Sequence, residues 1–375
     1  MNEKKIQKTI NKSCILQKIY YRKMLNKKSF LYRKYNSCQV ETKDIIDSTK
    51  PVIANIKNKD KLYVGLVKDK SRNNYYAKYE KFLIQNEIKY DFYDPFSPTF
   101  IEDAKKFDLI VWRVTDKVPN LTVSKNKIFF IENILKIKVY PSFNDVWCYE
   151  DKSLEYFLFK EYGFNPIPSF YTNNYEDALR YIETAKYPIV NKEVTSFSSL
   201  GVTLLKSKRK ASKFVKKVFG EGVRSSYPWA KQKDYVLFQE YIPNAVADIR
   251  VVCIGGEYFA GYYRLAKKND FRASGSGLVV KKEIPGVLLR QTKEIYKRLG
   301  YTHMFAVDYL ETENHNFLII ESSQFIGIET AQQTKENDVP GIYHYSQRND
   351  SFEFIEGDVW LQELDLKLFL EGANE

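Results

Sequence analysis

Apolar and polar residues alternate along the chain in blocks that predict strands and helices from about residue 59 onward. Between residues 59 and 140 the expected elements are a strand (61–69), a helix (74–88), a strand (89–95), a short helix (100–107) and a strand (108–114). Strands that alternate with helices are typical of a small parallel α/β domain. Because this region contains neither GxGxxG nor another glycine-rich phosphate loop, the pattern does not predict a dinucleotide site there.

The rest of the chain mixes helices with hairpins, so the expected fold class of the whole is α/β (α+β). Leu154, Phe157 and Leu158 form one apolar stripe at helical spacing, which predicts a helix after Asp151 that Gly163 stops. Further expected elements are a strand–loop–strand unit (187–207), a helix ending at Gly220, a strand (235–242), a hairpin (248–264) turned by Gly255-Gly256, and a helix (285–300).

Size and composition narrow the class of protein. A chain of 375 residues is long enough for two or three domains with a large core. No apolar run is long enough to cross a bilayer, and the first residues lack the apolar core and cleavage site of a secretion signal. The four cysteines form no CxxC pair and the three histidines have no metal-ligand spacing, which favours the reducing cytoplasm and disfavours a structural zinc.

The positive charge belongs to the start of the chain. Residues 1–36 contain eleven Lys or Arg and one acid, a net of +10 out of the formal +12. One reading of this basic arm, residues 1–58, is a segment that binds an acidic partner or the inner face of a membrane, and the other is a solvated extension. Nucleic-acid binding would rest on the arm alone and is not expected, because the remaining chain is nearly neutral and has no recognised motif.

Two acidic residues interrupt an apolar hairpin, FAVDYLETENHNFLIIESSQ, at 305–324. With TENH near the turn, Asp308 is expected opposite Glu321. The same register pairs Tyr309 with Ile320, Leu310 with Ile319 and Thr312 with Phe317. Two carboxylates about 5 Å apart at their Cβ atoms repel each other and are costly to desolvate, unless a divalent cation lies between them. Oxygen-only ligation, with Ser323 on the same face as a third oxygen, indicates Mg²⁺ rather than zinc. The alternative is that both acids are ordinary strand-end charges.

Other polar side chains suit the phosphates of a nucleotide. Lys192 ends an apolar strand and Lys152 begins a helix, and both are suited to pair with anions. The small, hydroxyl-rich stretch TSFSSLGV, with Ser198 and Ser199, is suited to close over bound ATP as a flap. Arg272, within NDFRASGSG, suits a bidentate clamp on a phosphoryl group. Each signal is weak alone, because a helix-start lysine is more often a solvated charge and SGSG more often a linker.

The order of these blocks resembles the ATP-grasp superfamily, in particular its RimK-like ligases, over roughly residues 141–335. The blocks are EDK with Lys152, YPIVNK with Lys192, FQEYIPNAVADIR, KKNDFRASGSG, and AVDYL with IIESS. The resemblance implies two nucleotide-binding lysines, a hinge near 235–248 that contacts adenine, and Asp308 and Glu321 as metal ligands. The further ATP contacts that it implies are Gln239, Glu240, Tyr241, Ile242, Asp248 (ribose), Arg272, Ala273 and Ser274.

Two positions depart from the family pattern. The metal motif normally ends Glu-x-Asn, whereas this chain has Ser323, a poorer ligand that would act through water. The flap normally contains more glycine, and here it keeps only Gly201. Two carboxylates and two lysines remain, so neither departure abolishes catalysis on physical grounds.

The resemblance implies an ATP-grasp fold preceded by a small Rossmann-like α/β domain. The expected division is the basic arm (1–58), the pre-ATP-grasp domain (59–140), the ATP-grasp domain (141–335) and a C-terminal extension (336–375). The implied cofactors are ATP and Mg²⁺, with Mn²⁺ as a substitute, and the implied location is the cytoplasm.

The activity that the resemblance implies is amide formation between a carboxylate and an amino-acid-like amine, through an acyl phosphate and with release of ADP. Lys192 and Arg272 are the expected catalytic side chains. Carboxylate substrates compatible with this chemistry include sugar acids of surface polysaccharides and acidic peptides. The rival function is a non-catalytic ATP-binding scaffold on the same fold, which Ser323 and the glycine-poor flap favour.

Overall fold

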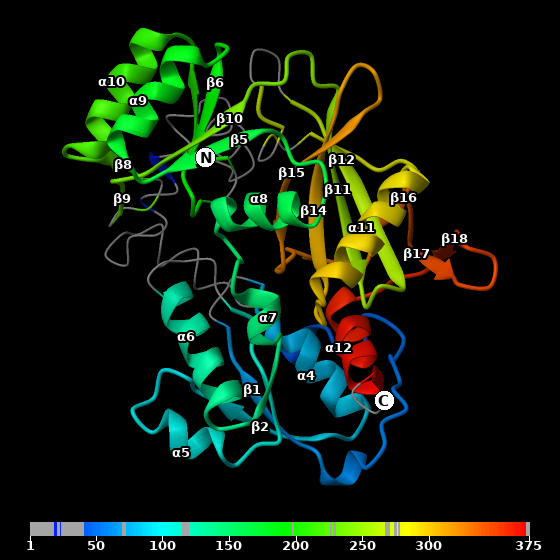
Figure 1. Cartoon of the computed structure of the whole chain (residues 1–375). Helices are drawn as coiled ribbons and strands as arrows, with labels where there is room; N and C mark the ends of the chain where they lie inside the picture. The colour runs from blue at the N-terminus through cyan, green and yellow to red at the C-terminus, as the bar shows by residue number, and fades with distance from the viewer. Residues whose placement is uncertain are drawn as a thin grey trace, which may run out of the picture.

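The computed structural model describes residues 41–372 except 70–72, 115–119, 197–198, 226, 228–229, 267–270, 274–275 and 277, together with residues 19, 20 and 23. Three sheets of four or more strands organise these residues (Figure 1). Most of the basic arm lies outside the described residues, so its binding to a membrane or an acidic partner stays a prediction.

The N-terminal sheet is parallel, as the alternation of strands and helices predicts. In spatial order its strands are β2 (Lys89–Tyr93), β1 (Tyr63–Val67), β3 (Leu109–Val111) and β4 (Lys138–Tyr140). Its helices are α4 (Tyr76–Gln85), α5 (Phe100–Ala104), α6 (Asn120–Asn133) and α7 (Phe143–Val146), and the short 3₁₀ helices η1 (Thr42–Asp44) and η2 (Lys59–Lys61) precede it. The sequence pattern does not predict α6, β4 or α7.

The small sheet is antiparallel and carries two helices on one face. Its strands in spatial order are β5 (Ser169–Thr172), β10 (Val236–Glu240), β6 (Ile189–Lys192) and β7 (Val202–Leu205). The helices are α9 (Tyr175–Thr184) and α10 (Lys208–Phe219), and a short hairpin of β8 (Val223–Arg224) and β9 (Lys231–Gln232) follows them. Ile189 and Phe238 pack in the core with α9 and α10, so the alternate residues of β6 and β10 face the other way.

The large sheet is also antiparallel. Its strands in spatial order are β15 (Phe317–Ser323), β14 (Phe305–Glu311), β11 (Ala247–Ile254), β12 (Tyr258–Arg264), β17 (Val339–Ser346) and β16 (Lys335–Glu336). The strand β13 (Val279–Val280) pairs with β12, and β18 (Ser351–Glu356) pairs with β17. The predicted hairpin turn between β11 and β12 is confirmed, with Gly255 and Gly256 at φ of 61° and 71°, where a side chain would be strained.

Helices from three parts of the chain pack around the large sheet. They are α8 (Lys152–Glu161), α11 (Gly286–Leu299) and α12 (Leu361–Gly372). Ile249 and Val251 of β11 pack in one core with Leu288 of α11. Val252 and Ile254 point to the opposite face and pack in a second core with α12 and α4.

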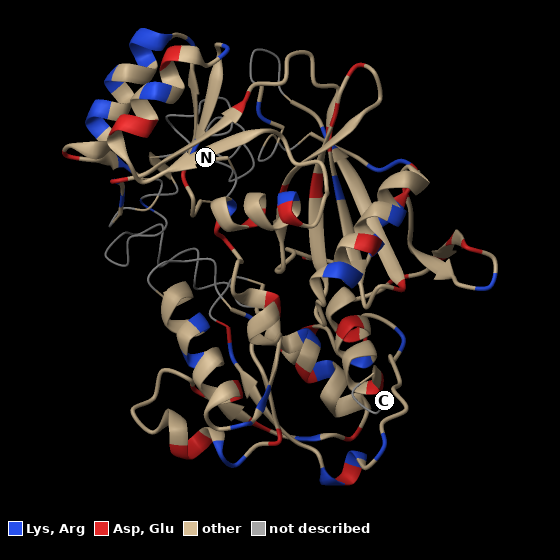
Figure 2. Ribbon diagram, viewed as in Figure 1, with Lys and Arg blue, Asp and Glu red and all other residues tan. Residues whose placement is uncertain are grey.

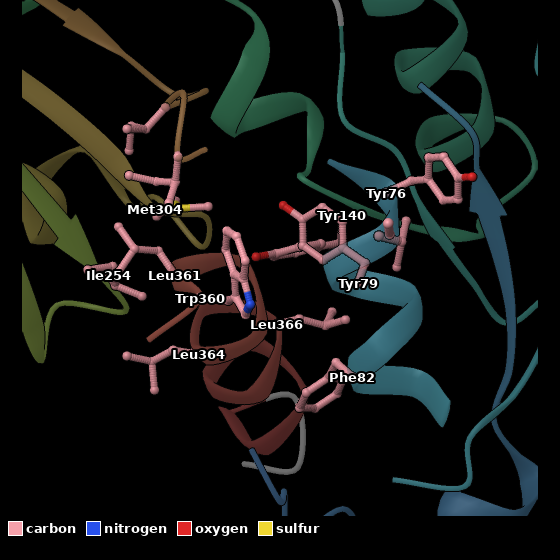
Figure 3. Packing of buried hydrophobic residues seen from close by; sticks show 14 of the residues in the cluster. Tyr76, Tyr79, Phe82, Tyr140, Ile254, Met304, Trp360, Leu361, Leu364 and Leu366 are labelled. Carbon is pink, nitrogen blue, oxygen red and sulfur yellow. The ribbon is translucent and has the colours of Figure 1, made fainter. Parts of the chain in front are cut away.

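The C-terminal helix α12 lies between the N-terminal sheet and the large sheet (Figure 3). Trp360 and Leu361 meet Tyr79 and Phe82 of α4 in one buried cluster. The helix also buries acids: Glu363 contacts Lys81 of α4 at 2.9 Å, and both side chains are fully buried. The C-terminal segment is therefore part of the core that joins the two sheets.

The charged side chains of the folded part are unevenly distributed, although the net charge of this part is small. The outward face of α10 gathers exposed cations (Figure 2) at Lys208, Arg209, Lys210, Lys213, Lys216 and Lys217. The opposite face of the same helix buries Ala211, Val215 and Val218. Among the described helices, none is long and apolar enough to span a membrane.

Candidate active site

A pocket lies where the open face of the small sheet meets α8 and β15. Its lining includes Lys152 and Glu155 of α8, Lys192 and Gln239 of the small sheet, and Ile320 and Glu321 of β15. The pocket holds about 300 Å³ of empty space, including the part open to solvent. Four residues predicted from the sequence, Lys152, Lys192, Gln239 and Glu321, are thus brought together from four separate elements, α8, β6, β10 and β15.

Lys152 lies among carboxylates at the start of α8. Its Nζ is 3.7 Å from Glu321 Oε2 and 3.9 Å from Glu150 Oε2, and it donates a 2.8 Å hydrogen bond to the Ser196 carbonyl of the flap. Burial lowers the pKa of Lys152, but Glu321 and the other nearby carboxylates outweigh burial and hold the pKa above its ordinary value. Lys152 is therefore a fixed positive charge that is in contact with Glu321.

Lys192 ends β6 on the pocket side and is 6% exposed. Burial lowers its pKa, and the neighbouring charge of Lys152 lowers it further, although Glu321 acts in the opposite direction. A buried ammonium group next to another cation is stabilised by an anion with several negative charges. Lys152 and Lys192 are therefore two neighbouring cations in the pocket lining, an arrangement suited to an anion.

The hairpin that contains Asp308 and Glu321 has the predicted pairing at these two residues. Asp308 pairs directly with Glu321, and Ser323 pairs with Ala306 on the same face as Glu321. The predicted register is wrong beyond that point, because a β-bulge follows Asp308. The observed pairs are Tyr309 with Ile319, Leu310 with Leu318 and Glu311 with Phe317. The extra residue, Ile320, locally disrupts the alternation, and both Ile320 and Glu321 line the pocket.

Asp308 is held by two arginines that the sequence reasoning missed. Arg250 Nε lies 2.6 Å from Asp308 Oδ1, and Arg250 Nη2 lies 2.7 Å from Oδ2. Arg264 Nη2 lies 2.6 Å from Asp308 Oδ2 and 2.5 Å from Asp248 Oδ1. Burial would raise the pKa of Asp308, but the two guanidinium groups outweigh it and hold the pKa well below its usual range. Asp308 is therefore a permanent anion, and Asp248, the predicted ribose contact, is engaged by Arg264.

The donor set can be tested for its fit to a divalent cation. Asp308 and Glu321 are opposed carboxylates, and in the described part of the chain no third His, Cys, Asp or Glu completes a metal-binding cluster with them. The Ser323 hydroxyl donates at 3.3 Å to the Phe325 carbonyl and keeps its lone pairs. Mg²⁺ in proteins is typically bound by one or two carboxylates, and phosphate and water oxygens complete its coordination shell. The residues fit Mg²⁺ or Mn²⁺ on the condition that a guanidinium group releases Asp308.

Glu155 is a buried carboxyl group of the pocket that the sequence reasoning missed. The predicted apolar stripe of α8 is wrong for Leu154 and Phe157, which are exposed, whereas Leu158 packs against the core. Glu155 and Phe159 are buried instead. Glu155 accepts a 3.0 Å hydrogen bond from the Ser322 amide and so ties α8 to β15 beside Glu321. Burial raises the pKa of Glu155 to about 8.

The flap and the basic block are in contact with each other. Arg272 Nη1 donates at 3.3 Å to the Ser199 carbonyl, and Gly201 is so close to Ser196 and Glu193 that any Cβ there would clash with them. The Gly201 position therefore needs glycine for close packing of the flap. Of the other predicted residues in these two loops, Ala273 accepts a 3.0 Å hydrogen bond from the Ser276 amide through its carbonyl, and Ser198 and Ser274 lie outside the described residues.

The predicted hinge residues lie at the end of β10 and beyond it. Gln239 is buried and donates to the Ser169 hydroxyl at 3.2 Å, Glu240 is exposed, and Tyr241 packs its ring on Phe271 at 5.9 Å between centroids. Among the described residues, several predicted contacts do not line the pocket. These are Ser199, Glu240, Tyr241, Ile242, Asp248, Arg272, Asp308 and Ser323.

Comparison with known proteins identifies the family. A family model described as the RimK-like ATP-grasp domain matches residues 150–341, which is just over half of the chain. This chain belongs to the RimK-like ATP-grasp family. The matched region contains α8, the small sheet, the strands from β10 to β15 and therefore every residue of the pocket described above.

Solved structures agree with an ATP-grasp fold at low sequence identity. N5-carboxyaminoimidazole synthetase from Staphylococcus aureus, complexed with ADP, has a TM-score of 0.50 and 10% identity, covering 75% of this chain and 74% of that chain. D-alanine–D-alanine ligase from Bacillus anthracis, complexed with ATP, has a TM-score of 0.48 and 15% identity, covering 70% and 86%. A search of curated proteins gave no match. At 10% identity, the likeness to the Staphylococcus aureus enzyme concerns the fold alone.

Proposed function

We propose that this RimK-like ATP-grasp protein is an ATP- and Mg²⁺-dependent ligase that joins a carboxylate to an amine. The observation that carries the proposal is the meeting of Lys152, Lys192 and Glu321 in one pocket between two sheets. Two buried ammonium groups next to a carboxylate are suited to hold a magnesium nucleotide, because the phosphates need cations and the metal needs oxygen ligands.

The nucleotide would bind with its phosphates toward the two lysines. Gln239 at the pocket and the following hinge residues Glu240, Tyr241 and Ile242 would contact adenine, and Asp248 the ribose. Asp308 and Glu321 would hold Mg²⁺, with Ser323 acting through water, and the ion would neutralise charge on the phosphates. Flap residues Ser198 and Ser199 would cover the phosphates, with Ser274 of the basic block opposite them.

The reaction would proceed by two displacements. An oxygen of the substrate carboxylate attacks the γ-phosphorus of ATP, the bond to the β–γ bridging oxygen breaks, and ADP leaves. The amine nitrogen then attacks the carbonyl carbon of the acyl phosphate, the carbon–oxygen bond breaks, phosphate leaves with that oxygen, and the nitrogen loses a proton. Lys192 and Arg272 would stabilise charge on the transferred phosphoryl group, and Arg272 the oxyanion of the second step.

The proposal extends to the classes of substrate. The carboxylate would belong to a sugar acid of a surface polysaccharide or to an acidic peptide, and the amine to an amino-acid-like compound. The protein would work in the cytoplasm, with the basic arm at the inner membrane face. These finer points rest on the resemblance and on the charge of residues 1–36.

One observation favours a second candidate, a non-catalytic ATP-binding scaffold. Both carboxylate oxygens of Asp308 are already engaged by arginines, and Ser323 stands where the family pattern has Asn. A scaffold would bind magnesium nucleotide without turnover, whatever carboxylate and amine are offered. The two candidates therefore differ in one measurable property, the dependence of ADP formation on a carboxylate.

The test is ADP formation from ATP and Mg²⁺ across a panel of carboxylates, including uronic acids and acidic peptides, each with mixed amino acids. If the protein is a ligase, at least one carboxylate should stimulate ADP formation, and Glu321→Gln should abolish the stimulation. Glu257→Gln, which removes a carboxylate at a 3.1 Å contact with His344 on the other end of the large sheet, is the matched control and should keep it. Nucleotide binding without stimulation across the panel favours the scaffold.

A further inference from the structure

Four charged side chains form a row on one face of the large sheet. Asp248 and Arg250 are two residues apart on β11, so they project to the same face. Arg250 pairs across the sheet with Asp308 of β14, and Asp248 pairs with Arg264 of β12. The four residues come from three adjacent strands, and farther along the same face Val252 and Ile254 pack with α12.

One nitrogen atom bridges the two carboxylates of this row. Arg264 Nη2 lies 2.5 Å from Asp248 Oδ1 and 2.6 Å from Asp308 Oδ2, while Arg250 binds both oxygens of Asp308. Asp248, Asp308 and Arg264 are exposed by 4%, 2% and 7%. Arg264 therefore occupies the position between two buried carboxylate oxygens where a divalent ion would otherwise bind.

The row is electrically balanced without any bound ion. Two aspartates face two arginines, and charge-assisted contacts satisfy the Asp308 carboxylate on both oxygens. A divalent cation brought to Asp308 in this state would meet two guanidinium groups at close range, and like charges in a buried site repel strongly. Glu321 is the neighbouring carboxylate, and it too has a cation near it, Lys152 at 3.7 Å.

We propose that Arg264 is an internal counter-cation, which occupies the cation position between Asp248 and Asp308 until phosphate draws it away. Binding of the divalent ion at Asp308 is then conditional on the nucleotide. The statement that phosphate draws Arg264 away rests on the proposed function, because the anion that competes for Arg264 is the triphosphate of ATP. Arg264 is a positioning residue here, and its effect is to couple the binding of two ligands.

The test is a titration of the nucleotide-free protein with Mn²⁺, followed by the electron paramagnetic resonance signal of the free ion. Arg264→Gln leaves Asp248 and Asp308 without their shared cation, so its Mn²⁺ affinity should rise at least about tenfold over the wild type, as expected for removing a charge at such short range. Adding Asp248→Asn to this variant should reverse the gain, because without a nucleotide Mn²⁺ would take the place of Arg264 between Asp248 and Asp308. Arg290→Gln, which removes an exposed arginine from its 2.6 Å contact with Asp350, should leave the affinity unchanged.

Arg264→Lys is the second variant, in case Arg264→Gln does not fold. It keeps the positive charge but loses the planar fork, so the Mn²⁺ affinity should rise by a smaller factor than in Arg264→Gln. The inference is overturned if the folded variants bind Mn²⁺ no more tightly than the wild type, or if the gain in Arg264→Gln survives Asp248→Asn. Because no nucleotide is present and no turnover is measured, these results are independent of whether the protein is a ligase.

Discussion

Asp308 on β14 and Glu321 on β15 are direct cross-strand partners, and the register shifts immediately after them. The bulge that causes the shift brings Ile320 and Glu321 together into the lining of the pocket, where Glu321 is 3.7 Å from Lys152. The local irregularity of β15 thus places a carboxylate in the pocket that Lys152 and Lys192 also line.

Glu321→Gln should lower the pKa of Lys152. Glu321 is the largest of the carboxylate effects that raise this pKa, and without it the effect of burial has less opposition. The pKa can be followed as the pH dependence of the reaction of Lys152 with an amine-specific reagent, read by mass spectrometry. An unchanged profile in Glu321→Gln would mean that the two side chains are not in contact in solution.

Lys192→Met should weaken nucleotide binding by about ten- to a hundredfold, the range expected for losing a hydrogen bond to a charged group. Calorimetric titration with a non-hydrolysable ATP analogue and Mg²⁺ measures the change. Lys208→Met is the matched control, because Lys208 is exposed on α10 and pairs with Glu183. Equal affinity of both variants for the analogue would place the phosphates away from Lys192.

Lys81→Met should destabilise the protein by about 3–5 kcal/mol, because it leaves the buried Glu363 carboxylate without its partner. Replacing both residues, Lys81→Met with Glu363→Leu, should cost less than the single change, since no charge is then left buried. Urea unfolding followed by far-ultraviolet circular dichroism gives both free energies of unfolding. If Lys81→Met is as stable as the wild type, α12 is not joined to α4 in the way described.

Glu132 should make stability depend on pH between about 5 and 8. Burial raises the pKa of Glu132 from its ordinary 4.5 to about 7, while its carboxylate accepts a 2.6 Å hydrogen bond from the Phe143 amide. The folded state therefore holds a proton that the unfolded state has lost, so this contribution to stability is complete below pH 4.5 and disappears as the pH rises through 7.

Glu132→Gln is always neutral and keeps the acceptor oxygen. The wild type should therefore lose stability relative to Glu132→Gln as the pH rises from 5 to 8, by no more than about 1 kcal/mol per pH unit. Urea unfolding of both proteins at four pH values measures the difference. A difference that is constant with pH would show that Glu132 titrates normally in the folded protein.

The sequence predicts the opposed carboxylates but not their surroundings. The prediction assumes that Thr312 pairs with Phe317 at the turn, and counting back from that pair places Asp308 opposite Glu321. In the structure Glu311 pairs with Phe317 instead, and the bulge at Ile320 restores the pairing of Asp308 with Glu321. The bulge has no local signal in the sequence, since the extra residue lies in a run of apolar residues. For that reason the three pairs nearer the turn are displaced by one residue from the predicted ones.

The same limit applies to the residues that the sequence reasoning missed. Leu154 and Phe157 have helical spacing, yet they face outward, because the inner face of α8 meets a polar pocket and buries Glu155 instead. Arg250 and Arg264 offered a readable signal, a charge within apolar strands whose hairpin turns at Gly255-Gly256. Their partner Asp308 comes from a third strand, and only the tertiary pairing of β11 with β14 reveals it.

The central claim is that a substrate carboxylate becomes an acyl phosphate in this pocket. Its most direct test uses a carboxylate with ¹⁸O at both oxygens, taken from the panel because it stimulates ADP formation, together with its amine. Mass spectrometry of the released phosphate should find one ¹⁸O atom for each amide formed, because the bond that breaks in the second step lies between carbon and the labelled oxygen. Amide formation with unlabelled phosphate, or ADP formation that no carboxylate stimulates, would contradict the account.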